Sequence, residues 1–223
     1  MNTNVGPERA ATDRVRAGYL DGARVAARLL GSLEVSRRWD TPSVLAGMSV
    51  GNLAGHLARS ILQVEWFLDE PVAEQSRVDA VTYYARLVGT ADPDSDLNRG
   101  VRRRSAETGS AGAAAVSSEA ESALARLESR LLDEPATRDV GIAHRPGEVM
   151  TLDDYLLTRC VELAVHIDDL AVSCDGLTQA PESTVSLAVD LLVSAARERN
   201  GERAVLLALT RRERDQVDAA RVL

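Results

Sequence analysis

The sequence predicts a mainly α-helical protein that ends in a short α(+β) extension. Aromatic residues make up only 3% of the chain, so the core must consist of Leu, Val and Ala, and this mixture favours helix over sheet. Apolar residues recur at the three- and four-residue spacing of an amphipathic helix in most long segments. Pro and Gly separate those segments. Together these observations indicate a helical bundle.

The first third of the chain predicts two long helices. Residues 1–7 are expected to be a frayed tail, and a helix is expected from Glu8 to about Ser36. The segment 37–48 contains Pro and Gly and is predicted to be a loop. Ser49 suits the N-cap of a second helix, Val50–Asp69, which stops before Pro71. At 100° per residue, His56 lies just beyond the edge of the apolar face of that helix.

The middle third is less regular. Residues 78–90 predict a short helix and residues 91–96 a turn. The segment from Leu97 to Asp133 predicts one long or broken helix, although the Ser/Ala/Gly run in its middle also fits a mobile linker. Residues 134–149 are predicted to be a loop that includes a strand at Asp139–Ala143.

The stretch Thr151–Gly176 predicts the central helix, with Thr151 as N-cap and Gly176 as C-cap. Its apolar residues cover most of the circumference, so the helix is expected to be largely buried. A polar stripe nevertheless runs beside the main apolar face, at spacings of 4, 3, 4 and 3. The stripe consists of Tyr155, Arg159, Glu162, His166 and Asp169. Buried charges are costly unless they are paired or bind a metal, so this stripe needs an explanation.

The C-terminal residues predict a shorter unit. A helix is expected over Ser186–Arg199 and a turn at Asn200-Gly201. Residues 203–210 form a short apolar run that fits strand or helix equally. We therefore divide the chain into a bundle, residues 8–176, and an extension, residues 177–223.

Composition and charge exclude several classes of protein. The net charge is −8, and a nucleic-acid-binding protein needs a clustered basic face. The three consecutive arginines at 102–104 would splay around a helix and are expected to face solvent. All 26 basic residues are arginine, a bias typical of a high-GC genome such as that of an actinobacterium. There is no signal peptide and no apolar run of 18 residues, so we expect a cytoplasmic protein without a membrane span, whose Cys160 and Cys174 are free thiols.

Three side chains suggest a metal site. Glu162 and His166 are four residues apart and present an oxygen and a nitrogen to the same point. With His56 they make a His₂Glu set, an arrangement that leaves a coordination position open in catalytic zinc sites. The alternative is purely structural, with Glu162 paired to Arg159 and His166 hydrogen-bonded in the core. The third histidine, His144, lies in a loop and is expected to be exposed.

Two segments resemble a known family. TPSVLAGMSVGNLAGHLARS resembles the histidine-containing segment of the mycothiol-dependent maleylpyruvate isomerase N-terminal domain family, and LDDYLLTRCVELAVHIDDLA resembles its second signature helix. The resemblance implies a DinB-like four-helix bundle with His56, Glu162 and His166 as ligands of zinc or another divalent metal. It also implies that Arg159 either supports these ligands or has a structural role, and that Asp169 either orients a ligand or caps the polar stripe.

The sequence also departs from the family pattern. The loop SVLAGM lacks the family's Cys, Trp and one Pro, and the extension after Gly176 is only 47 residues long. Near the end, ALTRRE resembles a family motif and aligns Arg212 with its arginine. Arg212 is therefore a candidate contact for a substrate carboxylate.

The resemblance implies a mycothiol-dependent S-transferase or isomerase. In such an enzyme a bound zinc ion lowers the pKa of the thiol, and the thiolate attacks a small electrophilic substrate. Two other functions remain open from the sequence. One is a non-catalytic metal-binding or regulatory module on the same bundle, and the other is a hydrolase that uses zinc-bound water. The sequence does not separate a monomer from a homodimer.

Overall fold

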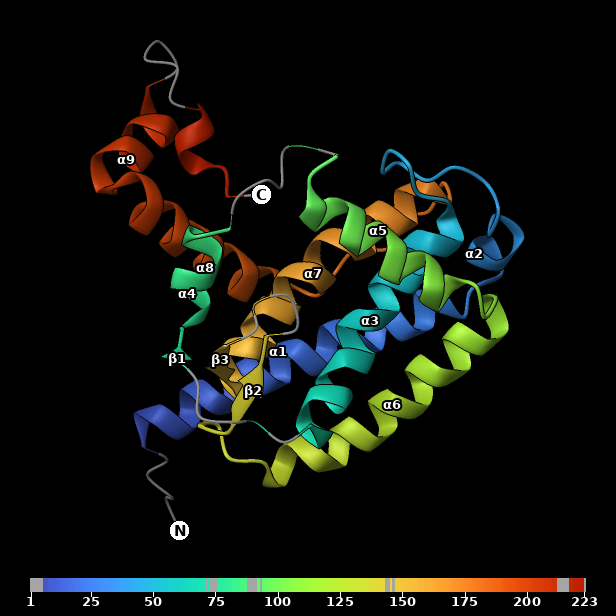
Figure 1. The fold of residues 1–223 in the computed structure, drawn as a ribbon, viewed down its shortest axis with the longest axis horizontal. Coiled ribbons are helices and arrows are strands. Elements are labelled where there is room, and N and C mark those ends of the chain that lie inside the picture. The colour runs from blue at the N-terminus through green and yellow to red at the C-terminus, as the bar shows by residue number, and fades with distance from the viewer. Residues whose placement is uncertain are drawn as a thin grey trace.

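The computed structural model describes residues 6–70, 72, 76–87, 92, 94–142, 145, 147–211 and 217–222. Four long helices pack around one core: α1 (Pro7–Leu30), α3 (Val50–Asp69), α6 (Ala113–Asp133) and α7 (Leu152–Ser173). Figure 1 shows them side by side along the length of the molecule. This arrangement confirms the mainly α fold and is consistent with the DinB-like bundle that the resemblance implied.

Local sequence signals set where the helices begin. The Ser49 hydroxyl accepts a hydrogen bond from the amide of Asn52, and the Thr151 hydroxyl accepts one from the amide of Asp154. Each cap satisfies a backbone donor that the first turn of a helix leaves free. The central helices α3 and α7 therefore start at the predicted residues. Their buried faces carry the core that the composition predicted, which includes Leu53, Leu57, Ile61, Leu152, Leu156, Leu163, Ile167 and Leu170.

Shorter helices cover the bundle. They are α2 (Leu33–Arg37), α4 (Ala80–Ala85), α5 (Asp96–Gly109), α8 (Glu182–Asn200), α9 (Glu202–Thr210) and the 3₁₀ turn η2 (Val217–Ala220). α5 packs along α3, whereas α8 packs against α7, α1 and α4. Residues 203–210 lie in α9 and are helical, whereas the sequence alone fitted either a strand or a helix. In Figure 1, α8, α9 and α4 lie together at one end of the molecule.

A three-stranded sheet precedes α7. β1 (Ser76–Arg77) pairs in parallel with β3 (Glu148–Thr151), and β2 (Asp139–Gly141) pairs antiparallel to β3 with Val140 opposite Met150. Val140 and Met150 are buried, so the sheet closes one side of the core. The predicted strand at 139–143 is present at 139–141. The prediction of a loop at residues 148–149 is wrong, because β3 begins at Glu148. The strand β1 was not predicted, because two exposed residues carry no periodic signal.

Two predicted helices are broken. The first helix ends at Leu30, and α2 follows separately after Ser32, whose side chain caps it. The segment 97–133 is split into α5 and α6 by residues 110–112, with Gly112 at a φ of 85° that favours glycine. The broken-helix prediction is therefore confirmed for this segment, and its Ser/Ala/Gly run, predicted alternatively as a linker, is helical from Ala113.

The end and one face of α7 also differ from expectation. The left-handed residue after the helix is Asp175, with a φ of 55°, and not Gly176. The amide of Gly176 donates to the carbonyl of Ala171 and that of Asp175 to Val172, the bonding pattern of a Schellman motif. Val165 and Val172 are exposed whereas Val161 is buried, so the apolar residues of α7 are less completely buried than the sequence predicts.

Cys160 and Cys174 are free thiols, as predicted, and both are buried. Among the described helices, none is both long enough and apolar enough to cross a membrane.

Candidate metal centre

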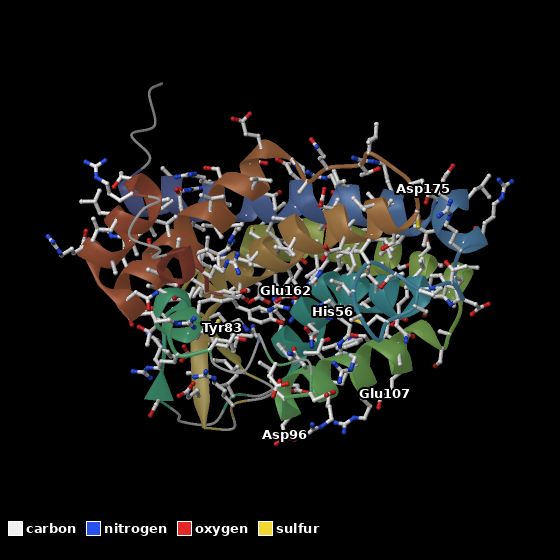
Figure 2. All side chains as sticks on the ribbon, turned by 90° about the horizontal axis from the view of Figure 1, so that it is seen from above. His56, Tyr83, Asp96, Glu107, Glu162 and Asp175 are labelled. Atoms are coloured by element: carbon white, nitrogen blue, oxygen red, sulfur yellow. The ribbon has the colours of Figure 1, made fainter. Side chains whose placement is uncertain are left out.

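Three side chains from two helices converge within the bundle. His56 projects from α3, and Glu162 and His166 project from α7. Glu162 Oε2 lies 3.2 Å from His56 Nε2 and 3.5 Å from His166 Nε2, and the potential ligand atoms all lie within 4.8 Å of one another. Figure 2 shows Glu162 and His56 close together in the middle of the molecule. The structure thus brings together the three residues predicted to bind a metal.

The position of the centre follows from helix geometry. Residues i and i+4 are neighbours on a helix surface, so Glu162 and His166 point the same way from α7. α3 packs directly on α7 and carries His56 at the edge of its apolar face. The side chains of His56, Glu162 and His166 are 17%, 24% and 18% exposed, respectively. The centre is therefore largely shielded from solvent but still accessible.

Each histidine is held by a second partner at its other ring nitrogen. Asp169 Oδ2 lies 2.9 Å from His166 Nδ1. Ser105 Oγ, on α5, lies 3.2 Å from His56 Nδ1 and donates its own hydrogen to the carbonyl of Val101 at 2.8 Å. Because that hydrogen is already used, Ser105 accepts from His56, which places the proton of a neutral His56 on Nδ1. The Nε2 lone pair of His56 is then free to face Glu162, and Asp169 favours the same tautomer in His166.

This donor set fits a divalent metal such as zinc. Zinc binds histidine nitrogens and carboxylate oxygens at about 2.1 Å, so two ligands of a tetrahedral ion stand about 3.4 Å apart. The two nitrogen–oxygen distances here, 3.2 Å and 3.5 Å, match that spacing. Two lone pairs and a carboxylate directed at one point repel each other unless a proton or a cation lies between them. Three protein ligands would leave a fourth position open.

In the metal-free chain, the pKa shifts of Glu162 and His166 show that these side chains attract positive charge. Burial alone would raise the pKa of Glu162, but its contacts with the imidazoles of His166 and His56 and the charge of Arg159 hold that pKa well below its usual value. Burial opposes charge on His166, yet its hydrogen bonds to Asp169 and Glu162 raise its pKa to about 9. Burial lowers the pKa of His56, an effect that Glu162 only partly offsets. In the metal-free centre, His166 is therefore protonated on both ring nitrogens at neutral pH, and Glu162 is ionised.

Arg159 lies beside the centre but is not a tight partner of Glu162. Its Nη2 is 4.0 Å from Glu162 Oε1, at the limit of an ion pair. Its hydrogen bonds go instead from Nε to Thr158 Oγ1 at 3.1 Å and from Nη1 to Gln63 Oε1 at 3.3 Å. The structural alternative, in which Arg159 neutralises Glu162, thus has weak geometric support.

Ser105 is the contact that sequence reasoning missed. It lies 49 residues from His56, in a segment whose local pattern shows only a helix. A serine inside such a helix carries no signal of its own, because its role depends on how α5 packs on α3. Two residues discussed from the sequence, His144 and Arg212, lie outside the described residues.

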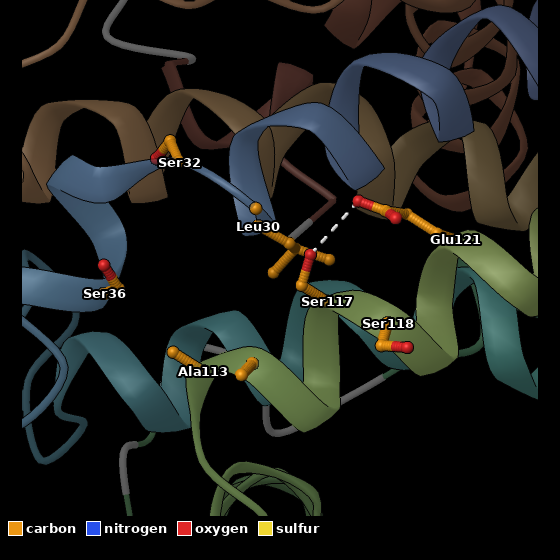
Figure 3. A pocket seen from close by; sticks show the side chains of 9 residues that line it. Leu30, Ser32, Ser36, Ala113, Ser117, Ser118 and Glu121 are labelled. Carbon is orange, nitrogen blue, oxygen red and sulfur yellow. Dashed lines mark hydrogen bonds between the residues drawn. The ribbon is translucent and has the colours of Figure 1, made fainter.

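A shallow depression of about 360 Å³ lies elsewhere, between the end of α1, α2 and the start of α6 (Figure 3). Its polar residues include Ser117, which donates a hydrogen bond to Glu121 at 3.3 Å. None of its lining residues belongs to the group formed by His56, Glu162 and His166.

A comparison with protein families places the chain in a known family. The model of the mycothiol maleylpyruvate isomerase N-terminal domain family matches residues 19–171, which is more than half of the chain. The chain belongs to this family. The matched region contains His56, Glu162 and His166, together with Ser105 and Asp169. No curated protein and no solved structure matches the chain.

Proposed function

We propose that this chain is a zinc-dependent enzyme that uses a low-molecular-weight thiol, mycothiol, and acts as an S-transferase or isomerase on a small electrophilic substrate. The family name associates the domain with mycothiol. The observation that carries the proposal is the convergence of two histidine Nε2 atoms on Glu162, each histidine being held at Nδ1 by a separate partner.

Each of these residues would have a separate role in binding the metal, the thiol or the substrate. His56, Glu162 and His166 would hold the metal, which supplies a positive charge that lowers the pKa of a thiol at the open position. Asp169 and Ser105 would keep both imidazoles in the metal-binding tautomer. Arg212, outside the described residues, is proposed to contact a carboxylate of the substrate. We assign the metal-binding unit to residues 8–176 and the remainder, 177–223, to the extension.

The test combines metal analysis with a thiol assay. Zinc per chain is measured by mass spectrometry for the unmodified protein, His166→Ala and Asp168→Asn. Asp168 is an exposed acid on the same helix and serves as the matched control. We expect one zinc in the unmodified protein and the control, and a loss in His166→Ala. Equal zinc in all three proteins would show that the metal site is assigned wrongly.

The same proteins are then mixed with mycothiol and a panel of electrophiles. We expect thiol consumption that requires zinc and is lost in His166→Ala. A protein that binds zinc but consumes no thiol would favour a regulatory module. Turnover without added thiol would favour a hydrolase that uses zinc-bound water.

A further inference from the structure

The helix α8 leaves a row of valines in contact with solvent. Val185, Val189 and Val193 are 39%, 51% and 39% exposed. They follow one another at four-residue spacing, so they lie along one face of the helix, opposite the buried Leu187 and Leu191 that pack on the bundle. A surface helix normally carries charged or polar residues on the face turned away from the core. The valine row therefore needs an explanation.

Exposed apolar surface is concentrated in the extension. Among the described residues, six of the twelve large apolar side chains that are exposed lie within residues 177–223, which are only 47 of the 223 residues. These six are Leu177, Val185, Val189, Val193, Leu206 and Leu209. The family model ends at residue 171, so this surface lies outside the matched region. Valine is also a poorer helix former than alanine or glutamate, so helix propensity does not explain the row on α8.

The valine row is complementary to a second copy of itself. A two-fold interface brings the same patch of both copies together, so the patch must match itself. If two α8 helices pack antiparallel about an axis at Val189, the two Val189 side chains meet, and Val185 meets Val193 of the second copy. Side chains four residues apart also form the ridge that most often packs between helices. Asp190, beside the axis, is already paired with Arg14 at 3.2 Å, so the axis does not join two unpaired acids.

The charges at the two ends of the row match the same pairing. Glu182, the first residue of α8, is exposed and forms no ion pair with any described residue. Arg197, in the last turn, is 50% exposed and pairs with the exposed Glu202 of its own chain, a contact that solvent weakens. Within one chain Glu182 and Arg197 are about 22 Å apart along the helix, so they cannot meet. In the antiparallel pair, each Glu182 faces Arg197 of the other copy, whereas a parallel pair would oppose the two Glu182 side chains.

We propose that the exposed face of α8 is a homodimer interface, on which a second copy of this chain packs antiparallel about a two-fold axis at Val189. The proposal does not depend on the metal or on the thiol reaction. The face is a single helix of 19 residues, about 28 Å long, so the interface lies at the small end of the range for specific complexes. We therefore expect a reversible dimer with a dissociation constant of roughly micromolar order.

Sedimentation velocity of the full chain over a range of concentrations tests the dimer. The unmodified protein should shift from monomer to dimer as its concentration rises through the micromolar range. Val189→Glu places two carboxylates at the axis and should weaken dimerisation by about tenfold or more. Val44→Glu is the matched control, because Val44 is 50% exposed and lies in the loop between α2 and α3, far from α8 in Figure 1. Dimerisation of the control should be unchanged.

A charge exchange tests the antiparallel arrangement. Glu182→Arg and Arg197→Glu each place like charges at both ends of the interface, so each variant alone should dimerise about fivefold or more weakly than the unmodified protein. In a mixed dimer of the two variants, both ends again join opposite charges. An equimolar mixture should therefore dimerise about as strongly as the unmodified protein at the same total concentration. Melting temperatures of the separate variants show that each is folded, and the recovery in the mixture cannot arise from misfolding.

Three results would overturn the proposal. One is an unmodified chain that stays monomeric throughout the concentration range, which would leave the valine row to another occupant. Another is a dimer that folded Val189→Glu does not weaken, and a third is a mixture of the charge variants that dimerises no better than either variant alone. Assemblies larger than a dimer that depend on Val189 would likewise reject a closed two-fold contact. All arms use metal-free protein, so none of these outcomes depends on zinc or thiol.

Discussion

At the scale of single residues, the centre depends on which ring nitrogen of each histidine carries the proton. Ser105 and Asp169 engage the Nδ1 atoms, so both Nε2 atoms face Glu162. Such outer partners fix the tautomer and orientation of a metal-binding imidazole. His56 and His166 are also in edge-to-face contact, with ring centres 4.5 Å apart, so neither ring can turn without disturbing the other.

The first prediction concerns Ser105. Ser105→Ala removes the acceptor for His56 Nδ1 and should lower the affinity for zinc by about 10- to 100-fold, the usual cost of losing an outer partner of a ligand. Competition with a chromophoric chelator measures this. Ser110→Ala, in an exposed serine at the end of the same helix, should leave the affinity unchanged. Equal affinities for both variants would mean that Ser105 does not orient His56.

A second prediction concerns pH in the metal-free chain. The pKa of His166 is raised to about 9 in the fold, above its unfolded value of about 6.5. Its charge therefore stabilises the fold fully below about pH 6.5, and this contribution is lost as the pH rises through about 9. We expect the free energy of unfolding to fall by up to about 3 kcal/mol over that range.

Urea unfolding of chelator-treated protein at several pH values tests this. Asp169→Asn removes a partner that raises the pKa of His166, so the decline with pH should be smaller in that variant. The same decline in both proteins would contradict the assignment.

At the scale of elements, glycines bring α5 close enough to α3 for Ser105 to reach His56. A Cβ atom on Gly55 would lie 2.4 Å from the carbonyl oxygen of Ser105 and 2.7 Å from the amide nitrogen of Gly109. A Cβ on Gly109 would lie 2.6 Å from the carbonyl oxygen of Gly51. The two backbones are in direct contact, and no side chain larger than hydrogen fits between them. The geometry of the proposed metal centre thus depends on how α5 packs on α3 as well as on the three proposed ligands.

The third prediction follows from that contact. Gly55→Ala should destabilise the fold by about 1–3 kcal/mol, because overpacking forces backbone apart, and it should weaken zinc binding by moving Ser105. Gly100→Ala is the control. There the added Cβ meets only the end of the Arg104 side chain at 3.1 Å, and alanine is the better helix former, so stability should stay equal or rise. Thermal unfolding and zinc titration of both variants measure the effects.

At the scale of the whole molecule, the extension is packed into the bundle through α8. Leu187, Ala188, Leu191, Ala195 and Ala196 of this helix are buried. Arg199, at the end of α8, donates hydrogen bonds to the carbonyls of Tyr84, Ala85, Leu87 and Val222. One guanidinium thereby satisfies the carbonyls that end α4 and connects them to the C-terminal residues.

The fourth prediction compares two arginines of α8. Arg199→Met leaves several carbonyls without a donor and should cost about 2–4 kcal/mol of stability. Arg197→Met is the control, since Arg197 is half-exposed and pairs with the exposed Glu202, so its loss should change stability by less than about 1 kcal/mol. Urea unfolding distinguishes them. Equal losses would mean that Arg199 does not join α8 to α4.

Much of the fold could be predicted because its signals are local. Ser49 and Thr151 cap the helices that they precede, and the apolar periodicity of α3 and α7 extends over five or six turns. Breaks were harder to place, because Ser32 and Gly112 act at single positions within continuous helical patterns. The short strands were harder still, since β1 and β3 are stabilised by pairing with each other across about 70 residues, which no local pattern records.

The sequence by itself determined the helical class, the spacing of Glu162 and His166 on one helix face, and the resemblance that added His56 and Asp169. All of these depend on residue order and on the 3.6-residue turn. Only the tertiary structure decided that Ser105 holds His56, that Arg159 is not the close partner of Glu162, and which face of α8 stays in contact with solvent. These facts depend on the distance between helices far apart in the chain. In α3 and α5 that distance is set by glycines, whose effect appears only when two backbones meet.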